Sequence, residues 1–335
     1  LEAFESEYAA FCGSGHCVGV ANGTAAIELA LRAVGAGPGT EVITVSHTFV
    51  ATVEAVQATG ARPVLVDVEP QTRCMDPAAA GAAVTSRTRA ILPVHLYGRP
   101  APLEAVSAAC ASARIPMVED AAQAHGALLE GRRTGTVGTA GCFSFYPTKN
   151  LGAMGDGGAV ITNDEDVAAL VRSLRHHGSS PGDANRHHYV GRTERLDNLQ
   201  AAILRLKLRA LDADNDHRRW AADQYRERLA GLPLDLPPED PPEGRAVHHL
   251  FVIELDDRDR VREGLRERGV LAGVHYPTPV HMQPGWAHLG YESGDLPVTE
   301  RLAERILSLP IFPGIEEREI ERVVDALRAC LGLGS

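Results

Sequence analysis

Residues 141–164 read GCFSFYPTKNLGAMGDGGAVITND, and they contain Lys149, one of two lysines in a chain of 335 residues. The other is Lys207, so arginine supplies 31 of the 33 basic side chains (33 minus 2). An arginine cannot give up its proton in a protein, whereas a lysine can, and a neutral amine can form a Schiff base. We therefore interpret Lys149 as a candidate for amine chemistry. The alternatives are a surface lysine in a glycine-rich hairpin for Lys149 and, for Lys207, a solvated lysine on a helix.

The residues around Lys149 suit a site that binds a flat ligand. The run 142–145 reads as a short apolar strand that carries Ser144, and a turn at Pro147 follows it. Glycine lets the backbone approach a ligand closely or adopt a positive φ angle. The residues after Lys149 include Gly152, Gly155, Gly157 and Gly158.

The chain from residue 18 to 162 alternates between strand-like and helix-like runs, the pattern that builds a parallel sheet with helices on its faces. The strand-like runs are nearly all apolar, as expected when both faces of a sheet are buried. The sequence predicts an α/β fold whose large domain has a mostly parallel sheet covered by helices. We expect strands within 18–22, 41–46, 62–68, 89–98, 115–120 and 142–145, and helices within 24–35, 48–60, 76–84 and 102–113.

Ligands of such sheets bind outside the carboxyl ends of the strands, and this rule selects candidate residues. Gly23 and Thr24 open a helix, where backbone amides could hold a phosphate; a simple N-cap by Asn22 or Thr24 is the alternative. Phe49 follows a strand and could stack on a ring, or could be an ordinary core residue. Ser144 lies at the end of a third strand.

Asp120 ends the apolar run 115–118, and an unpaired charge there would be costly. Its partner could be an arginine or the protonated nitrogen of a heterocyclic cofactor. Gln123 and His125 follow in the same segment and add hydrogen-bonding groups. A phosphate cradle, a stacking ring, a carboxylate for a pyridinium nitrogen and a Schiff-base lysine are together the groups that pyridoxal 5′-phosphate requires.

The motifs resemble those of the nucleotide-sugar aminotransferases of the DegT/StrS group, which are pyridoxal-phosphate enzymes of the aspartate-aminotransferase fold. The resemblance runs through the whole chain. It rests on NGTAAIELAL, PGTEVITVSHTFVAT, AILPVHLYG, VEDAAQAHGA, residues 141–164 and RLDNLQAAIL.

The resemblance implies a role for each matching residue. Lys149 would form the Schiff base with the cofactor, Asp120 would pair with its ring nitrogen, and Gln123 would lie near its phenolic oxygen. Phe49 would stack on the ring. The phosphate-binding set would be Gly23, Thr24 and Ser144. Relatives with histidine in place of the lysine catalyse dehydration, so the presence of Lys149 disfavours that reaction.

One motif departs from the family pattern. Members of the family have an asparagine in a GYNSRLDELQ-like segment, which contacts the phosphate of the neighbouring subunit's cofactor. This chain has GRTERLDNLQ, with Thr193 at that position. We expect a homodimer with active sites at the subunit interface, in which Thr193 or Arg195 replaces the asparagine. The chain also begins inside an amphipathic helix, so we expect further residues before Leu1.

The C-terminal third predicts a smaller domain. A long helical segment near 195–230 would leave the large domain (1–215), and a proline-rich connector at 236–244 would lead into a small α+β domain (216–335). Expected there are strands within 247–255 and 270–277 and helices within 257–269 and 316–331. The loop HYPTPVHMQP (275–284) resembles the family loop at the entrance to the active site. His275, Tyr276 and His281 would line the path of the sugar nucleotide; a rigid proline turn is the alternative.

Metal binding is disfavoured at both histidine-containing clusters. Cys12, His16 and Cys17 lack the spacing of paired metal ligands, so we expect buried thiols in a reducing compartment. His176, His177, His187 and His188 flank the loop GSSPGDAN without a neighbouring carboxylate or cysteine ligand, and a mobile loop near the active site is the better interpretation.

The composition excludes several classes of function. A net charge of −11 without a basic stripe argues against nucleic-acid binding. No apolar run is long enough to span a bilayer and no signal peptide precedes the first helix, so we expect a cytoplasmic protein.

The sequence therefore predicts an aminotransferase that moves an amino group, by the family resemblance from L-glutamate, to a 3- or 4-keto-6-deoxysugar linked to thymidine diphosphate. The sequences of the motifs are slightly closer to those of enzymes that act at the third carbon of the sugar. A ketocyclitol aminotransferase of aminoglycoside biosynthesis is the alternative. A dinucleotide-dependent oxidoreductase would need a GxGxxG turn, which VGVANGT lacks. A non-catalytic regulator would be expected to have lost Lys149 or Asp120.

Overall fold

The central layer is a mixed sheet with the strand order β3-β2-β4-β5-β8-β9-β1, in which isolated parallel bridges from Ile91 to Met117 and from Val94 to Asp120 join β4 to β5. Neighbouring strands are parallel except at β9, which runs antiparallel to β8 and β1. The prediction of a mostly parallel sheet is thus confirmed. The strands are β1 His16–Val20, β2 Glu41–Val45, β3 Arg62–Val66, β4 Thr88–Ile91, β5 Val118–Asp120, β8 Ala140–Ser144 and β9 Gly158–Thr162. This computed structural model describes residues 1–180, 183–240 and 243–333.

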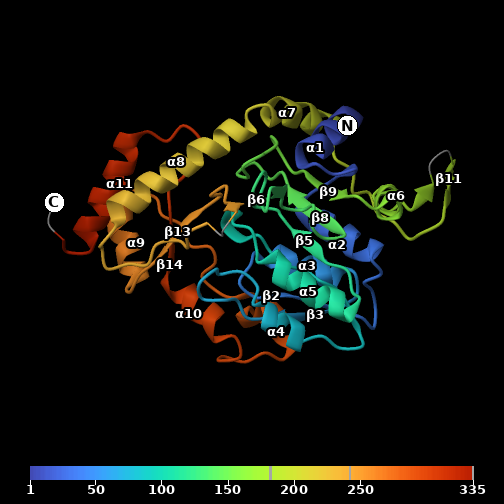
Figure 1. Ribbon diagram of the computed structural model, residues 1–335, viewed down its shortest axis with the longest axis horizontal. Helices are drawn as coiled ribbons and strands as arrows, with labels where there is room; N and C mark the ends of the chain where they lie inside the picture. The colour runs from blue at the N-terminus through green and yellow to red at the C-terminus, as the bar shows by residue number, and fades with distance from the viewer. Residues whose placement is uncertain (181–182, 241–242, 334–335) are drawn as a thin grey trace.

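Helices cover both faces of the sheet (Figure 1). Side chains alternate along a strand, so Val42 packs with α2, α3 and α6 on one face while Ile43 packs with α4 and α5 on the other. Both faces are therefore apolar, which explains why the strands read as continuous apolar runs. The helices of this part are α1 Glu2–Cys12, α2 Gly23–Ala33, α3 Val50–Ala58, α4 Pro77–Ala82, α5 Leu103–Ala113 and α6 Glu165–Leu174.

The long helical segment is two helices, α7 Asn198–Leu208 and α8 Leu211–Leu229. The apolar spacing continues across the junction at Arg209, so the sequence did not mark it. Leu211 packs with α1 and α7, whereas Tyr225 and Leu229 pack with the C-terminal elements. In Figure 1 α8 accordingly crosses from the layer near α1 to the helices α9 and α11.

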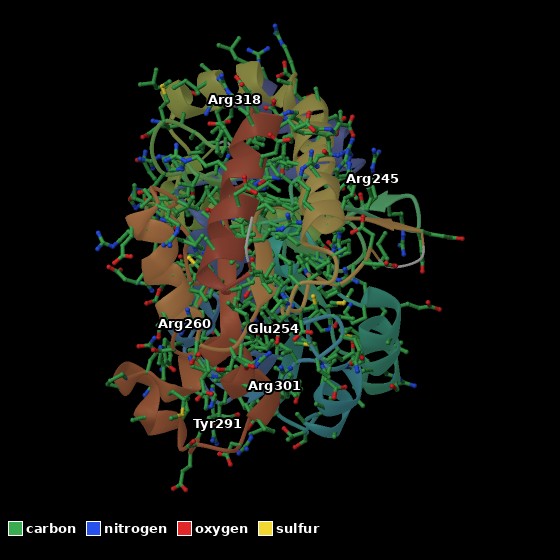
Figure 2. The ribbon with its side chains drawn as sticks, turned by 90° about the vertical axis from the view of Figure 1, so that its left-hand side faces the viewer. Arg245, Glu254, Arg260, Tyr291, Arg301 and Arg318 are labelled. Atoms are coloured by element: carbon green, nitrogen blue, oxygen red, sulfur yellow. The ribbon has the colours of Figure 1, made fainter. Side chains whose placement is uncertain are left out.

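The C-terminal elements form a second apolar cluster around an antiparallel strand pair. Glu254, at the end of this pair, binds Arg301 with a nitrogen-to-oxygen distance of 2.9 Å, and Figure 2 shows the two residues side by side. Glu254 also binds the buried Arg73 at 2.8 Å, which ties the segment after β3 to the C-terminal strands. The elements are β13 Phe251–Glu254, β14 Ile306–Leu309, α9 Arg258–Glu267, α10 Pro297–Arg305 and α11 Glu317–Cys330.

Short elements complete the described chain. They are β6 Leu128–Leu129, β7 Arg132–Arg133, β10 Ser179–Ser180, β11 Asp183–His187, β12 Gly244–Arg245, and the 3₁₀ turns Leu96–Gly98, Val280–Met282 and Pro284–Leu289.

Two predicted strands are shorter than expected. The strand expected at 89–98 ends at Ile91, because Pro93 has no N–H group for the ladder and Tyr97 adopts a left-handed φ of 62°. The strand expected at 270–277 is reduced to a bridge between Gly273 and Ser308. Neither α10 nor β14 was predicted. The loop expected between His176 and His188 contains β10 and β11, and its residues 181–182 lie outside the described chain.

Candidate active site

A cavity of about 560 Å³ opens at the carboxyl ends of β2, β5 and β8 and at the start of α2. It brings together every residue that we predicted to bind the cofactor, with the exception of Thr193. His275 and Tyr276, predicted to bind the substrate, line it as well. The cavity is lined by Asn22, Gly23, Thr24, Ile27, Thr48, Phe49, Ala51, Thr52, Val94, Asp120, Ala122, Gln123, Ser144, Tyr146, Thr148, Lys149, Asp156, His249, Leu250, His275 and Tyr276.

Lys149 lies in the turn after β8, where its backbone N–H donates to the carbonyl of Tyr146 at 2.8 Å. Burial lowers the pKa of its amine to about 8, although the negative charge of Asp120 acts in the opposite direction. At pH 7 an amine with this pKa is about one-tenth neutral, a share several hundred times larger than at the ordinary lysine pKa. The environment thus supplies the property that the sequence predicted for this residue.

Asp120 ends β5 and is 4% exposed. Its Oδ2 accepts a hydrogen bond from the Thr52 hydroxyl at 2.8 Å, and its Oδ1 accepts one from the Ala122 amide at 3.1 Å. Since Thr52 donates to the carboxylate, Thr48 must donate to Thr52, 2.8 Å away. Burial nevertheless raises the pKa of Asp120. The carboxylate therefore lacks a full counter-charge and would gain one from a cation in the cavity.

Glu119 precedes Asp120 and points away from the cavity into the sheet. Its carboxylate accepts hydrogen bonds from the amides of Gly135, Val137 and Gly138 at 2.6 to 2.8 Å. It also lies 2.8 Å from His95 Nε2. The Nδ1 of His95 accepts from the Ala101 amide, so Nε2 must donate to Glu119. This buried network fixes the end of the strand from which Asp120 projects.

The start of α2 and the end of β8 form a narrow polar corner. Asn22 caps the helix by accepting from the Ala25 amide at 2.8 Å, so the simple capping interpretation is correct. The amides of Gly23 and Thr24 have no acceptor inside the helix and can still bind an anion. A Cβ atom at Gly23 would lie 2.7 Å from the Cβ of Ser144, so a larger residue there would displace Ser144.

Two aromatic rings and a glutamine lie on another side of the cavity. The rings of Phe49 and Tyr276 have centroids 5.5 Å apart and are tilted by 39°. Gln123 donates to the Tyr276 hydroxyl at 3.1 Å and accepts from the Tyr97 amide at 2.7 Å. Phe49 is 52% exposed, so it is not the core residue that the alternative interpretation required.

The structure does not place His281 in the cavity. Its ring is buried between Ser46, 2.7 Å from Nδ1, and Glu300, 3.1 Å from Nε2. The prediction that His281 lines the substrate path is therefore wrong: 3₁₀ turns from Val280 to Leu289 fold this part of the loop against Val53 and Leu65. His281 instead anchors the loop that carries His275 and Tyr276.

Thr193 also does not line the cavity of its own chain. It is exposed, and its hydroxyl lies 3.0 Å from Nε2 of His177, while Arg195 lies 2.8 Å from Nδ1 of His176. A contact with a neighbouring subunit's cofactor stays a prediction. Lys207 is exposed as expected, but its amine donates to the Gly152 carbonyl at 2.7 Å and so supports the glycine-rich turn.

Sequence reasoning missed Thr52 and His249. Thr52 lies in the first turn of α3 and its hydroxyl reaches Asp120 at the end of β5, a neighbour that only the sheet order reveals. His249 precedes β13 and reaches the cavity from the C-terminal part of the chain. The paired histidines before an apolar strand were a weak signal for it.

Comparison with known proteins agrees with the family resemblance of the sequence motifs. The family model described as the DegT/DnrJ/EryC1/StrS aminotransferase family matches residues 1–328. The dTDP-3-amino-3,4,6-trideoxy-alpha-D-glucose transaminase of Streptomyces venezuelae is 46% identical to this chain. The alignment covers 98% of this chain and 86% of that transaminase. A Saccharopolyspora erythraea protein named erythromycin biosynthesis sensory transduction protein EryC1 is 47% identical over 98% of this chain and 89% of its own length.

Solved structures agree with the sequence relatives. S. venezuelae DesV in complex with a ketimine intermediate superimposes with a TM-score of 0.96 at 46% identity, covering 100% of this chain and 90% of DesV. NtdA of Bacillus subtilis, with bound cofactor PMP, has a TM-score of 0.92 at 33% identity and covers 99% of this chain and 77% of NtdA.

Proposed function

Because the chain belongs to the DegT/DnrJ/EryC1/StrS aminotransferase family, we propose that it transfers the amino group of L-glutamate to a ketosugar linked to a nucleotide, in the biosynthesis of a deoxyaminosugar. The chain is an aminotransferase that uses pyridoxal 5′-phosphate. The observation that carries the proposal is a lysine amine with a pKa of about 8 in one cavity with the buried Asp120.

The residues of the cavity fit pyridoxal phosphate. The corner between Gly23 and Ser144 would be filled by a single Cβ atom, and it offers free amides of Gly23 and Thr24 to a phosphate. The carboxylate of Asp120, whose pKa is raised by burial, suits a protonated ring nitrogen. Phe49 would offer its exposed ring for stacking, and the side-chain amide of Gln123 would be available to the ring oxygen. The donor set therefore matches the cofactor group by group.

Each residue has a definable part in the reaction. When bound, pyridoxal phosphate supplies an aldehyde that takes up the amino group and a ring that withdraws electrons from the bond being broken. Asp120 holds a proton at the ring nitrogen, and Thr52 and Ala122 orient its carboxylate. The neutral amine of Lys149 takes up and returns the proton of the donor's α-carbon. His275 and Tyr276, which line the cavity, would contact the sugar nucleotide.

Thymidine diphosphate and the third carbon of the sugar are the substrate features that we favour. Support comes from the relative of S. venezuelae, whose name specifies a dTDP-3-amino sugar. The ketocyclitol substrate of aminoglycoside biosynthesis is the second candidate, since the motifs of the two groups are shared. Loss of the lysine or of Asp120 would have favoured a regulator; this chain retains both.

We also propose a homodimer in the cytoplasm. Helix α7 exposes Leu199 and Leu206, which are 70% and 66% exposed and seven residues apart, so they lie on one face. A second copy of this chain would cover that face and bring Thr193 towards the neighbouring cavity. The six cysteines are buried and unpaired, as in a reducing compartment. None of the described helices combines the length and apolarity needed to cross a bilayer.

The test is to supply the purified protein with pyridoxal phosphate, L-glutamate and either the 3-keto or the 4-keto isomer of the dTDP-deoxysugar. We expect an aminosugar product from the 3-keto isomer. Lys149→Ala should reduce turnover by about 10³-fold or more, because it removes the proton-transfer group. Lys207→Arg, which keeps a charged donor for the Gly152 carbonyl, is the matched control. Full activity of Lys149→Ala, or turnover of neither isomer by the wild type, would contradict the proposal.

A further inference from the structure

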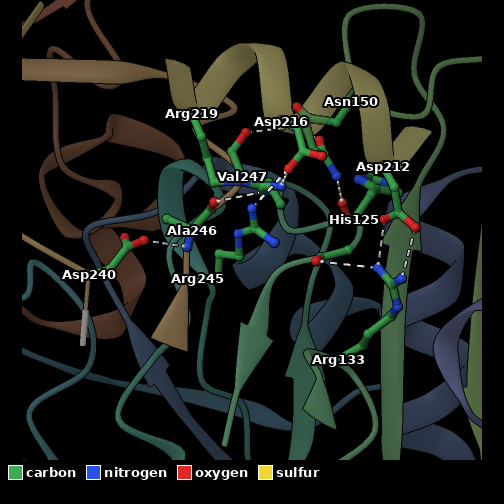
Figure 3. Close-up of polar contacts among 12 residues, drawn as sticks. His125, Arg133, Asn150, Asp212, Asp216, Arg219, Asp240, Arg245, Ala246 and Val247 are labelled. Atoms are coloured by element: carbon green, nitrogen blue, oxygen red, sulfur yellow. Dashed lines mark hydrogen bonds and ion pairs between the residues drawn. The ribbon is translucent and has the colours of Figure 1, made fainter. Parts of the chain in front are cut away.

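His249 is held by two side-chain amides, those of the half-buried Asn150 and the buried Asn215, which link the residue after Lys149 to α8. Asn150 Oδ1 lies 3.1 Å from Nδ1 of His249. Asn150 Nδ2 donates to Asn215 Oδ1 at 2.9 Å and to the Val247 carbonyl at 3.0 Å. Asn215 is 1% exposed, and its Nδ2 donates to the His125 carbonyl at 2.8 Å. Figure 3 shows the dashed contacts of Asn150, Val247 and His125 beside α8.

Two backbone carbonyls fix the direction of these hydrogen bonds. A carbonyl can only accept, so the His125 and Val247 carbonyls determine which end of Asn215 and of Asn150 is the NH₂ group. The opposite end of Asn150, facing His249, must then be the oxygen. An amide oxygen also can only accept, so Nδ1 of His249 must carry the proton.

The other ring nitrogen of His249 is consequently an acceptor. The imidazole is neutral because burial, and then the charges of Lys149, Arg218, His125 and His275, lower its pKa well below the ordinary value. A neutral ring with its proton on Nδ1 carries a lone pair on Nε2. Among the described residues, Nε2 has no hydrogen-bond partner, and it is not among the sealed polar atoms that lack one. It therefore faces the cavity that His249 lines.

An acceptor in this position selects among the ligands of the proposed reaction. The carboxylates of glutamate only accept hydrogen bonds, and its amine is the group being transferred. The phosphate and ring oxygens of pyridoxal phosphate also accept, and its ring nitrogen is assigned to Asp120. The ligand groups that remain able to donate belong to the sugar nucleotide: its hydroxyls and, in a thymidine nucleotide, the N3–H group of the base. His249 is held by Asn150, the chain neighbour of Lys149, and both His249 and Lys149 line the cavity, which favours a hydroxyl near the reacting carbon.

We propose that His249 is a specificity-determining residue whose Nε2 accepts a hydrogen bond from the ring hydroxyl adjacent to the sugar's carbonyl. The inference rests on the proposed function and deepens it. It assigns a substrate-contacting role to a residue outside the loop 275–284. It also gives the hydrogen-bonded pair of Asn150 and Asn215 a purpose: they hold the imidazole in the tautomer that this contact requires.

The experiment uses two variants that separate the ring nitrogens. His249→Asn keeps an N–H group near Nδ1 for Asn150 and removes the acceptor, whereas His249→Gln places an amide oxygen near Nε2. In protein labelled with ¹⁵N-histidine, we expect a resonance pair from a ring protonated at Nδ1 only, which disappears in both variants. For His249→Asn we expect the KM for the ketosugar to rise about tenfold while the KM for glutamate changes less than twofold, with partial recovery in His249→Gln.

Binding provides a readout that does not depend on turnover. Calorimetric titration of the cofactor-free protein with the aminosugar nucleotide should show a Kd about tenfold weaker for His249→Asn. A deoxy analogue that lacks the adjacent hydroxyl should bind both proteins equally. Three outcomes would each overturn the role of His249. They are a ring protonated at Nε2, an equal rise in both KM values, and equal binding of the hydroxylated ligand by wild type and His249→Asn. Failure of the wild type to bind any nucleotide sugar would overturn the proposed function as well, while the tautomer would still be measured.

Discussion

The charge state of Lys149 results from two opposed influences. Burial favours the neutral amine, while Asp120 favours the ammonium ion, and the outcome is a pKa of about 8. The nearby imidazoles of His125, His249 and His275 all have lowered pKa values, first through burial and then through the charge of Lys149. The three histidines near Lys149 are thus neutral, so they add no further positive charge next to its amine.

Removing the charge of Asp120 should therefore lower the pKa of Lys149. In Asp120→Asn we expect the midpoint to fall below that of the wild type, near pH 8, by about half a unit to one unit. The measurement is the pH dependence of acylation by an amine-selective reagent in cofactor-free protein, read by peptide mass spectrometry. Lys207, the other lysine of the chain, serves as the internal control for the reagent. An unchanged or higher midpoint would show that Asp120 does not act on this amine.

Glu119 should stabilise the fold at neutral pH. Burial alone would raise the pKa of Glu119, but the bond from His95 and the amides of Gly138 and Gly135 outweigh it, and the net pKa is lowered from 4.5. This stabilisation is present above the ordinary pKa and is lost as the pH falls through the lower folded-state value. We expect Glu119→Gln to reduce the free energy of unfolding by about 2 to 4 kcal/mol at pH 7.

The pH dependence distinguishes this account from a simple packing defect. The difference between wild type and Glu119→Gln in urea titrations should shrink below pH 4.5, because the wild-type carboxylate is then protonated in the unfolded chain. A difference that stays constant down to pH 3 would point to packing alone.

At the scale of elements, the approach of α2 to β8 forms the phosphate corner of the proposed site. Gly23→Ala should force Ser144 away, since the new Cβ would lie 2.7 Å from that of Ser144. We expect the affinity for pyridoxal phosphate to fall about tenfold or more, while helicity changes little because alanine favours helices. Gly285→Ala is the matched control, as its Cβ would meet no atom within 4 Å. Cofactor titration by absorbance compares the two variants, and equal affinities would refute a role for this corner.

The loop 275–284 contains both cavity-lining residues and a residue that anchors the loop to the rest of the protein. His275 and Tyr276 line the cavity, whereas His281, five residues later, is fixed to Ser46 of the segment after β2 and to Glu300 of α10. The sequence presented three aromatic polar residues in one motif. Only the reversal of the chain at the 3₁₀ turns separates the binding residues from the anchoring one.

On the scale of the whole molecule, the cavity is assembled from both ends of the chain. Residues before 160 supply the sheet edge, and His249, His275 and Tyr276 arrive from beyond α8. The bonds of the buried Arg73 to Glu254 and to the Val252 carbonyl, at 2.8 and 2.7 Å, help to hold the two parts together. A division into domains at 1–215 and 216–335 stays a proposal. Residues 280–296 cross the proposed boundary, since they pack against α3 and β3 of the N-terminal part.

The exposed face of α7 leads to a prediction about assembly. If the proposed dimer forms through this face, Leu199→Asp combined with Leu206→Asp should convert it to a monomer in analytical ultracentrifugation, because two charges would be buried without partners. Leu271→Asp is the control, since this leucine is 79% exposed and lies in the C-terminal part. Activity should fall with dissociation if Thr193 serves the neighbouring cavity. A dimer that persists in the double variant would place the interface elsewhere.

The sequence by itself determined the alternation of buried strands and helices, and the residues that end the strands: Asp120, Ser144, and Gly23 at the start of α2. These follow from local chemistry, because apolar runs mark the strands and parallel strands have their carboxyl ends at one edge of a sheet. The tertiary structure alone decided that Thr52 reaches Asp120, that His249 joins the cavity through Asn150 and Asn215, and that His281 turns away. Each of these depends on contacts between residues far apart in the sequence, and no local pattern encodes such a contact.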